Sequence, residues 1–318
     1  MFSLYLPIAN VHVNLLWMLL FGFVVGGMAG FFGVGGGFLI TPMLNALFGV
    51  PYPVAVGSSL SLLVGITVAS TIRHSKYGNI DYKLGLVMVI GTAIGVDVGA
   101  RLLILIKGLQ NLLPAMEGHH IDVLEIVLSL SYIVMLSLIG LSIFRESLKT
   151  MKMTKSVSSG VQVSGEPEAS EGVKRIRALK IKPMIRFPAS GISGISLWVI
   201  MGIALVVGMM SGFMGIGGGF ILMPALIYII GCPTVIAVGT SLFGILFTAA
   251  YGSFTYSLEG NIDLVLVTSL LISSAIGSVI GASFTRKAGG PNVRMLFSLI
   301  AFVAVIIVGI KLGATVLH

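Results

Sequence analysis

Residues 30–38 read Gly-Phe-Phe-Gly-Val-Gly-Gly-Gly-Phe, and residues 212–220 repeat them as Gly-Phe-Met-Gly-Ile-Gly-Gly-Gly-Phe. The same spacing of 182 residues (212 minus 30) relates residues 56–60 to residues 238–242. It also relates the Gly-Asn-Ile-Asp sequence at 78–81 to its copy at 260–263. One register that persists over about seventy residues indicates an internal duplication rather than chance similarity. The chain is therefore built from two related halves.

The composition predicts that both halves lie in a membrane. Of the 318 residues, 56% are hydrophobic and 9% are charged, and the mean hydropathy is +1.08, whereas soluble proteins carry about 25% charged residues. Each half holds five apolar segments, most of them near the ~20 residues that span a bilayer as a helix. The sequence thus predicts an all-α integral membrane protein with segments at 13–33, 36–49, 53–74, 83–107 and 121–144, and at 194–215, 218–230, 234–256, 262–285 and 293–315.

A basic linker separates the halves. We predict a first membrane repeat at 1–145, a linker at 146–192 and a second membrane repeat at 193–318. Positive charges gather in the linker, and the chain carries a formal net charge of +8. This pattern favours an anionic membrane surface over nucleic acid as the partner of the linker. We interpret it as a solvated connection, with a short basic amphipathic helix at 173–186 as the alternative.

Charge also predicts the orientation in the cell membrane. Short loops rich in Lys and Arg stay in the cytoplasm, so the linker and the loops around Lys76 and Lys287 should face the cytoplasm and both termini should lie outside. Because each half has an odd number of segments, the two halves then have opposite orientations. The predicted plan is a pair of inverted-topology repeats, which many secondary transporters share.

The second segment of each half is too short to cross a bilayer. About 14 residues of helix measure about 21 Å, against ~30 Å of hydrocarbon. Each segment begins at a glycine cluster and contains a proline, Pro42 or Pro224, which we expect to break the helix. Matched short, Gly/Pro-interrupted segments are typical of a transporter binding site. We predict that backbone N–H groups at the glycines bind an anion, namely at Gly35, Gly36, Gly37, Gly217, Gly218 and Gly219; the alternative is that these glycines only permit close packing.

Polar side chains within the apolar segments are the other candidates. Hydroxyls follow the same Val-Gly pair in both halves, at Ser58 and Ser59 and at Thr240 and Ser241. They could contact the ligand or only bond the preceding turn of helix. Asp97 and Arg101 are spaced to pair on one helix face. We consider them for coupling or gating, although Arg101 near the outer end could simply reach the interface.

The sequence predicts neither a metal site nor a cofactor. Cys232 is the single cysteine, which excludes a disulfide framework and a cysteine metal site, and the histidines have no metal-ligand spacing. A membrane-embedded enzyme would need a cluster of His, Glu or Asp at membrane depth, where we find only Asp97. We therefore expect no enzyme activity.

The glycine motif with Pro42, the Gly-Ser-Ser sequence at 57–59 and the Gly-Asn-Ile-Asp sequence at 78–81, each with its second copy, resemble the TauE/SafE family of sulfite exporters, also called the TSUP permeases. The resemblance covers the chain except the linker. It implies transport of a sulfur-containing anion such as sulfite or an organosulfonate, driven by ion gradients. We expect alternating access around a midplane site, with a coupled proton or cation and with a homodimer left open. A passive anion channel is the alternative.

Overall fold

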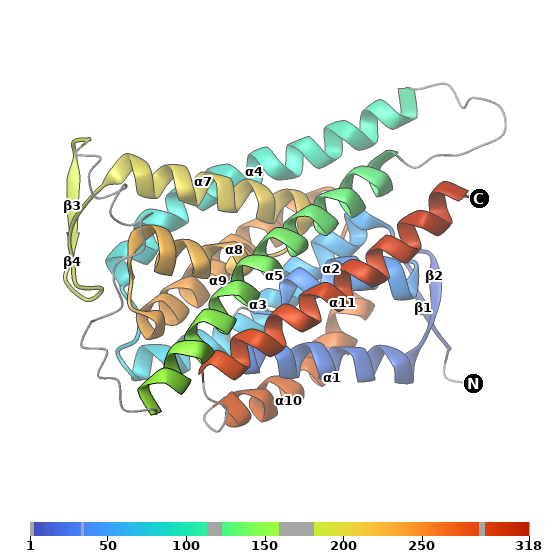
Figure 1. Ribbon diagram of the computed structural model, residues 1–318. Coiled ribbons are helices and arrows are strands. Elements are labelled where there is room, and N and C mark those ends of the chain that lie inside the picture. The colour runs from blue at the N-terminus through green and yellow to red at the C-terminus, as the bar shows by residue number, and fades with distance from the viewer. Residues whose placement is uncertain (1–2, 33–34, 113–122, 159–180, 286–289, 318) are drawn as a thin grey trace.

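The computed structural model describes residues 3–32, 35–112, 123–158, 181–285 and 290–317, and its helices form an elongated bundle (Figure 1). The prediction of an all-α membrane protein is confirmed, because the helices fall on the predicted apolar segments. Within the described residues, six helices are long and apolar enough to cross a membrane, and shorter apolar helical stretches lie at Leu15–Ala29, Gly37–Phe48, Gly219–Ile230 and Leu264–Ile280. The helices are α1 (Leu15–Phe32), α2 (Gly37–Phe48), α3 (Tyr52–Lys76), α4 (Tyr82–Leu112), α5 (Val123–Ser158), α7 (Leu197–Met214), α8 (Gly219–Pro224), the π-helix η1 (Ala225–Ile230), α9 (Thr234–Leu258), α10 (Leu264–Thr285) and α11 (Gly290–Leu317).

The helices of the two halves are interleaved. α1 packs most extensively against α10, and its counterpart α7 packs against α4. The remaining long helices pack against their own counterparts, α3 against α9 and α5 against α11. Neither half therefore forms a separate bundle, and the core runs through both.

Glycines make the α4–α7 and α1–α10 contacts possible. A Cβ atom on Gly95 would lie 2.2 Å from the carbonyl oxygen of Leu205, and one on Gly99 would lie 2.1 Å from that of Met209. On α10, a Cβ on Gly277 would lie 2.1 Å from the carbonyl oxygen of Phe23. Small residues allow backbones to approach this closely in a membrane bundle, so these glycines are packing residues.

Each half is preceded by a short antiparallel β-hairpin that the sequence reading did not predict. The first consists of β1 (Ser3–Leu6) and β2 (Val11–Asn14), and the second of β3 (Met184–Phe187) and β4 (Ile192–Ser196). Their turns contain left-handed residues at matching places, Asn10 (φ 53°) and Gly191 (φ 66°). The two hairpins lie at opposite ends of the bundle (Figure 1).

Regular secondary structure extends into both ends of the predicted linker. α5 runs on to Ser158, past the predicted boundary at residue 145, and β3 and the first residue of β4 lie within the predicted 146–192. Met and Lys, which are frequent after residue 150, favour helix even outside the membrane. Of the alternative amphipathic helix at 173–186, residues 173–180 lie outside the described residues, while Met184–Phe187 is a strand.

The two short segments differ at their prolines. We expected Pro42 to break the helix, but α2 continues through it. As the sixth residue of α2, Pro42 removes one backbone hydrogen bond, and most of the helix is buried. At Pro224 the α-helix α8 ends and the π-helix η1 begins. Both segments end at a left-handed glycine, Gly49 or Gly231.

Candidate functional site

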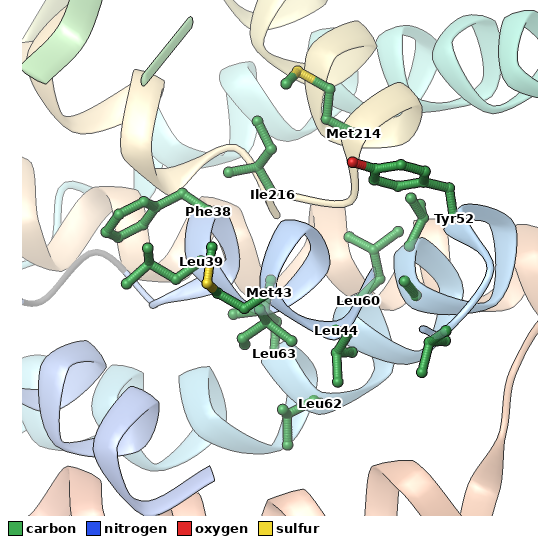
Figure 2. Close-up of a cluster of buried hydrophobic side chains, with 14 of the residues drawn as sticks. Phe38, Leu39, Met43, Leu44, Tyr52, Leu60, Leu62, Leu63, Met214 and Ile216 are labelled. Atoms are coloured by element: carbon green, nitrogen blue, oxygen red, sulfur yellow. The ribbon is translucent and has the colours of Figure 1, made fainter. Parts of the chain in front are cut away.

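The glycine clusters of the two halves meet in the interior. We call Gly35–Gly37 glycine loop 1 and Gly215–Gly219 glycine loop 2; Gly33 and Val34 lie outside the described residues. A Cβ atom on Gly37 would lie 2.4 Å from the carbonyl oxygen of Ile216 in loop 2. Figure 2 shows the chain at Met214 and Ile216 passing beside the start of α2 at Phe38.

The contact between the loops involves equivalent residues of the two halves. Cβ atoms placed on Gly35 and on Gly217 would both lie against the side chains of Leu63 and Ile245, which are themselves 182 residues apart. The rings of Phe38 and Phe220, the next equivalent pair, stack with centroids 4.5 Å apart, and both are buried. α2 and α8 therefore begin side by side, at one place in the molecule.

The backbone of both loops is of the kind that only glycine adopts readily. Gly35 and Gly36 have φ values of 80° and 75°, and Gly217 and Gly218 have 69° and 80°. Gly36 and Gly218 are the N-caps of α2 and α8, and no side chain caps either helix in the described structure. Each helix therefore presents its positive dipole end at the meeting point, which favours an anion there.

Hydroxyl groups hold the carbonyl groups at the end of α7 and the start of loop 2. The Ser59 Oγ atom lies 2.9 Å from the Gly215 carbonyl oxygen and 2.7 Å from Thr41 Oγ1. Tyr132 donates a hydrogen bond to the Met214 carbonyl, and Tyr256 donates one to the Gly212 carbonyl at 2.7 Å. The sequence analysis proposed Ser59 but not Thr41, Tyr132 or Tyr256. The feature that could have identified these three is a hydroxyl group within a strongly apolar helix.

Ser58 and Thr240 face other partners. The backbone N–H of Asp263 donates to Ser58 Oγ at 3.0 Å, and that of Asp81 donates to Thr240 Oγ1 at 2.9 Å. The preceding glycines fit against the same turns: a Cβ on Gly57 would lie 2.3 Å from the Asn261 carbonyl oxygen. Residues 56–60 of the first half therefore pack against the Gly-Asn-Ile-Asp motif of the second half, and residues 238–242 pack against that of the first half. Ser241 Oγ donates to the Val238 carbonyl of its own helix at 2.9 Å.

The aspartates of the two Gly-Asn-Ile-Asp motifs, for which the sequence predicts no role, are buried, and their carboxylates accept several hydrogen bonds. The carboxylate of Asp81 accepts hydrogen bonds from Ser190 Oγ at 2.6 Å and from the Leu84 N–H at 3.0 Å. Asp263 accepts from the N–H groups of Ile8, Ala9, Val265 and Leu266. Each aspartate thus caps a helix of its own half and holds the β-hairpin turn that precedes the other half.

Asp97 and Arg101 form an ion pair on the surface of α4. Arg101 Nε lies 2.8 Å from Asp97 Oδ2, and the two side chains are 78% and 33% exposed. The structure does not bring this pair to the glycine loops, so its role in coupling or gating stays a prediction. As for metals, no group of three His, Cys, Asp or Glu side chains among the described residues could hold an ion.

The chain is similar in sequence to known membrane transporters. The family model of the sulfite exporter TauE/SafE matches residues 18–312. Two Bacillus subtilis (strain 168) proteins named probable membrane transporter protein are similar: YunE is 26% identical over 290 residues, covering 89% of this chain and 93% of YunE, and YdhB is 27% identical over 264 residues, covering 83% and 87%. A probable membrane transporter protein of Xylella fastidiosa (strain 9a5c) is 23% identical over 290 residues, covering 90% of this chain and 92% of the relative.

No solved structure matches the chain. The family match nevertheless spans nearly all of it, including both glycine loops, both aspartate turns and the apolar helices of both halves. The chain is a multi-pass membrane transporter and belongs to the TauE/SafE family of sulfite exporters.

Proposed function

We propose that this protein is a secondary transporter of a small sulfur-containing anion, such as sulfite or an organosulfonate. The observation that carries the proposal is the meeting of two uncapped, glycine-started helices, α2 and α8, at one place between the halves. Two positive helix ends directed at one site favour an anion. The description of the matched family, sulfite exporter, supplies the substrate class.

The proposed site consists mainly of backbone. The N–H groups near Gly35–Gly37 and Gly217–Gly219 bind the anion oxygens. Ser59, which contacts the Gly215 carbonyl, assists them, and Ser241 is its equivalent in the second half. We assign Ser58 and Thr240 a supporting role, because their oxygens accept the N–H groups of Asp263 and Asp81. This refines the prediction that all four hydroxyls contact the ligand.

The site must open for the anion to enter. In the conformation described here both loops are buried, with Leu63, Ile245 and the stacked rings of Phe38 and Phe220 against them. Alternating access, in which one half rocks against the other, would expose the site to one side of the membrane at a time. The alternative, a passive anion channel, would instead open the site to both sides at once.

We further propose that the halves are inverted repeats, with both termini outside and the linker in the cytoplasm. Support comes from Figure 1, in which the β1–β2 hairpin and the C-terminal end of α11 lie at one end of the bundle and β3–β4 lies at the other. In the same view α1 starts at one end of the bundle and its counterpart α7 starts at the opposite end. Lys83 at the start of α4 and Arg186 on β3, whose carbonyl accepts a hydrogen bond from Lys83 Nζ at 3.0 Å, would then face the cytoplasm, as the positive-inside rule requires.

Flux into proteoliposomes tests the proposal. The panel contains sulfite, sulfoacetate, methanesulfonate, a simple carboxylate and chloride, each with and without an imposed pH gradient, and protein-free liposomes are the control. Saturable accumulation of one sulfur anion against its own gradient is the expected result. Flux that only dissipates a gradient would establish the channel instead, and absence of flux for every sulfur anion would refute the substrate class.

A further inference from the structure

A buried serine near the end of α7 lies against the start of α8. The relative exposure of Ser211 is 0%. A Cβ atom on Gly218 would lie 3.8 Å from Ser211 Cβ and 2.9 Å from Val207 Cγ1, so both side chains face this glycine. Gly218 belongs to glycine loop 2 and is the N-cap of α8, which no side chain caps in the described structure. Ser211 therefore lies beside a helix end that has no capping group.

The hydroxyl group of Ser211 has no hydrogen-bond partner in the part of the chain that the structure describes. Serines within other helices bond the preceding turn; Ser131 Oγ on α5, for example, donates to the Val127 carbonyl at 2.7 Å. A buried hydroxyl without a partner is costly and rare in native proteins. The position of Ser211 beside glycine loop 2 indicates that a bound ligand accepts its hydrogen bond.

The carbonyl groups around Ser211 are bonded by other donors. Tyr256 donates to the Gly212 carbonyl at 2.7 Å. The Ser211 carbonyl itself accepts from the Gly215 N–H, also at 2.7 Å. Ser59 Oγ contacts the Gly215 carbonyl at 2.9 Å. The acceptors at this end of α7 are thus already bonded, which leaves the Ser211 hydroxyl as a donor for an oxygen from outside the chain.

The first half has no hydroxyl at the equivalent position. Ser211 corresponds to Ala29 (211 minus 182), which is buried. Ala29 lies against Gly36, the N-cap of α2, because a Cβ atom on Gly36 would lie 2.9 Å from Ala29 Cβ. The two glycine loops have similar backbone conformations, but glycine loop 2 has a hydroxyl donor where glycine loop 1 has a methyl group.

The helix that starts at Gly218 is comparable to α2. α8 continues directly into η1, and Gly219–Ile230 forms one apolar helical segment, as Gly37–Phe48 does. Its N-terminus carries the positive end of the helix dipole, and the first N–H groups of a helix have no partner within the helix. Backbone N–H groups and the Ser211 hydroxyl are therefore available to the same ligand beside Gly218.

We propose that Ser211 is an anion-binding residue of this transporter, whose hydroxyl donates a hydrogen bond to an oxygen of the anion. The charged sulfur group then binds closer to glycine loop 2 than to glycine loop 1, because loop 2 offers the additional donor. Sulfite and a sulfonate both present oxygens that accept such a bond. This inference rests on the proposed function and assigns one further residue to its site.

The test combines binding and stability measurements on the purified full-length protein. Saturation binding of radiolabelled sulfite and of radiolabelled methanesulfonate gives the affinity, and thermal unfolding in detergent without anion gives the stability. A hydrogen bond to a charged group corresponds to about tenfold or more in affinity. Ser211→Ala should therefore bind both anions about tenfold or more weakly. Its midpoint of unfolding without anion should equal or exceed that of the wild type, because the substitution removes a buried donor that has no partner.

Ser196→Ala is the matched control. Ser196 is also fully buried, and its hydroxyl also has no partner in the described structure. It is the N-cap of α7, and it lies 15 residues before Ser211, about 22 Å along the helix. The same change at this opposite end of α7 should leave the affinity for both anions at the wild-type value.

Three outcomes would overturn the inference while leaving the proposed function intact. The first is wild-type affinity in Ser211→Ala. The second is an equal loss of affinity in Ser196→Ala, which would show that the substitutions act through α7 as a whole. The third is a lower midpoint of unfolding for Ser211→Ala without anion, because a hydroxyl that stabilises the anion-free protein has a partner within it. A wild-type protein that binds neither anion would instead refute the proposed function, and the inference with it.

Discussion

Asp81 and Asp263 each tie a helix of one half to a hairpin turn next to the other half. Their carboxylates are buried, and every described partner is an N–H group or, at Asp81, the Ser190 hydroxyl. A buried donor that loses its acceptor costs ~1–3 kcal/mol of unfolding free energy. These interactions fix the turn of each β-hairpin to the start of a helix of the other half.

Replacing Asp263 by alanine should therefore lower stability markedly. The N–H groups of Ile8, Ala9, Val265 and Leu266 would lose their acceptor, and we expect a loss of at least ~1–3 kcal/mol, measured as a lower midpoint of thermal unfolding in detergent. Asp97→Ala is the control, because an exposed ion pair contributes ~0–1 kcal/mol. Equal midpoints for the two variants would contradict the role given to Asp263.

Alanine substitutions of the neighbouring residues Ser58 and Ser59 should distinguish a role in stability from a role in anion binding. Ser58→Ala removes the acceptor of the Asp263 N–H and should cost ~1 kcal/mol of stability with unchanged anion affinity. Ser59→Ala, which loses a contact to glycine loop 2, should weaken anion binding. Both are measured by thermal unfolding and by radioligand binding on the same preparations. Weaker binding by Ser58→Ala at unchanged stability would return Ser58 to the binding site.

Among the helices, the glycine-lined contacts are the features most sensitive to size. Gly99→Leu on α4 would press a side chain against the Met209 carbonyl and the Phe213 backbone nitrogen. Overpacking costs ~1–3 kcal/mol and occasionally more, so this variant should unfold at a lower temperature. Gly309→Leu on α11, where nothing lies within 4 Å, is the control and should match the wild type. A tolerated Gly99→Leu would show that α4 and α7 are not held by this contact.

Most of the helical elements could be predicted from sequence because they contain long apolar runs. The same logic located the short segments, since Gly49 and Gly231 end them in left-handed conformation. The hairpins could not be predicted, because strands of four or five residues are too short for a periodic pattern. The contacts of Asp81, Tyr132 and Glu125 were also not predictable, because their partners lie about 80 to 190 residues away in the sequence.

At the scale of the whole molecule, the orientation of the two halves is open to chemical labelling. Burial raises the pKa of the Cys232 thiol to about 11, so at neutral pH this cysteine stays protonated and gives no background. In intact cells, a membrane-impermeant thiol reagent should label Glu259→Cys, in a loop predicted outside. It should label Lys76→Cys, at the predicted cytoplasmic end of α3, only after the membrane is permeabilised. The reverse pattern would contradict the proposed topology.

The central claim is that one anion binds where glycine loops 1 and 2 meet. Its most direct test is saturation binding of radiolabelled sulfite to the purified protein, with Gly36→Val, Gly218→Val and Gly202→Leu compared to the wild type. A Cβ on Gly36 would lie 2.9 Å from Ala29 Cβ and one on Gly218 2.9 Å from Val207 Cγ1, whereas nothing lies within 4 Å of Gly202. We predict one site per chain, lost in either of the first two variants and kept in the third. Two sites per chain, or normal binding by Gly36→Val or Gly218→Val, would contradict the account.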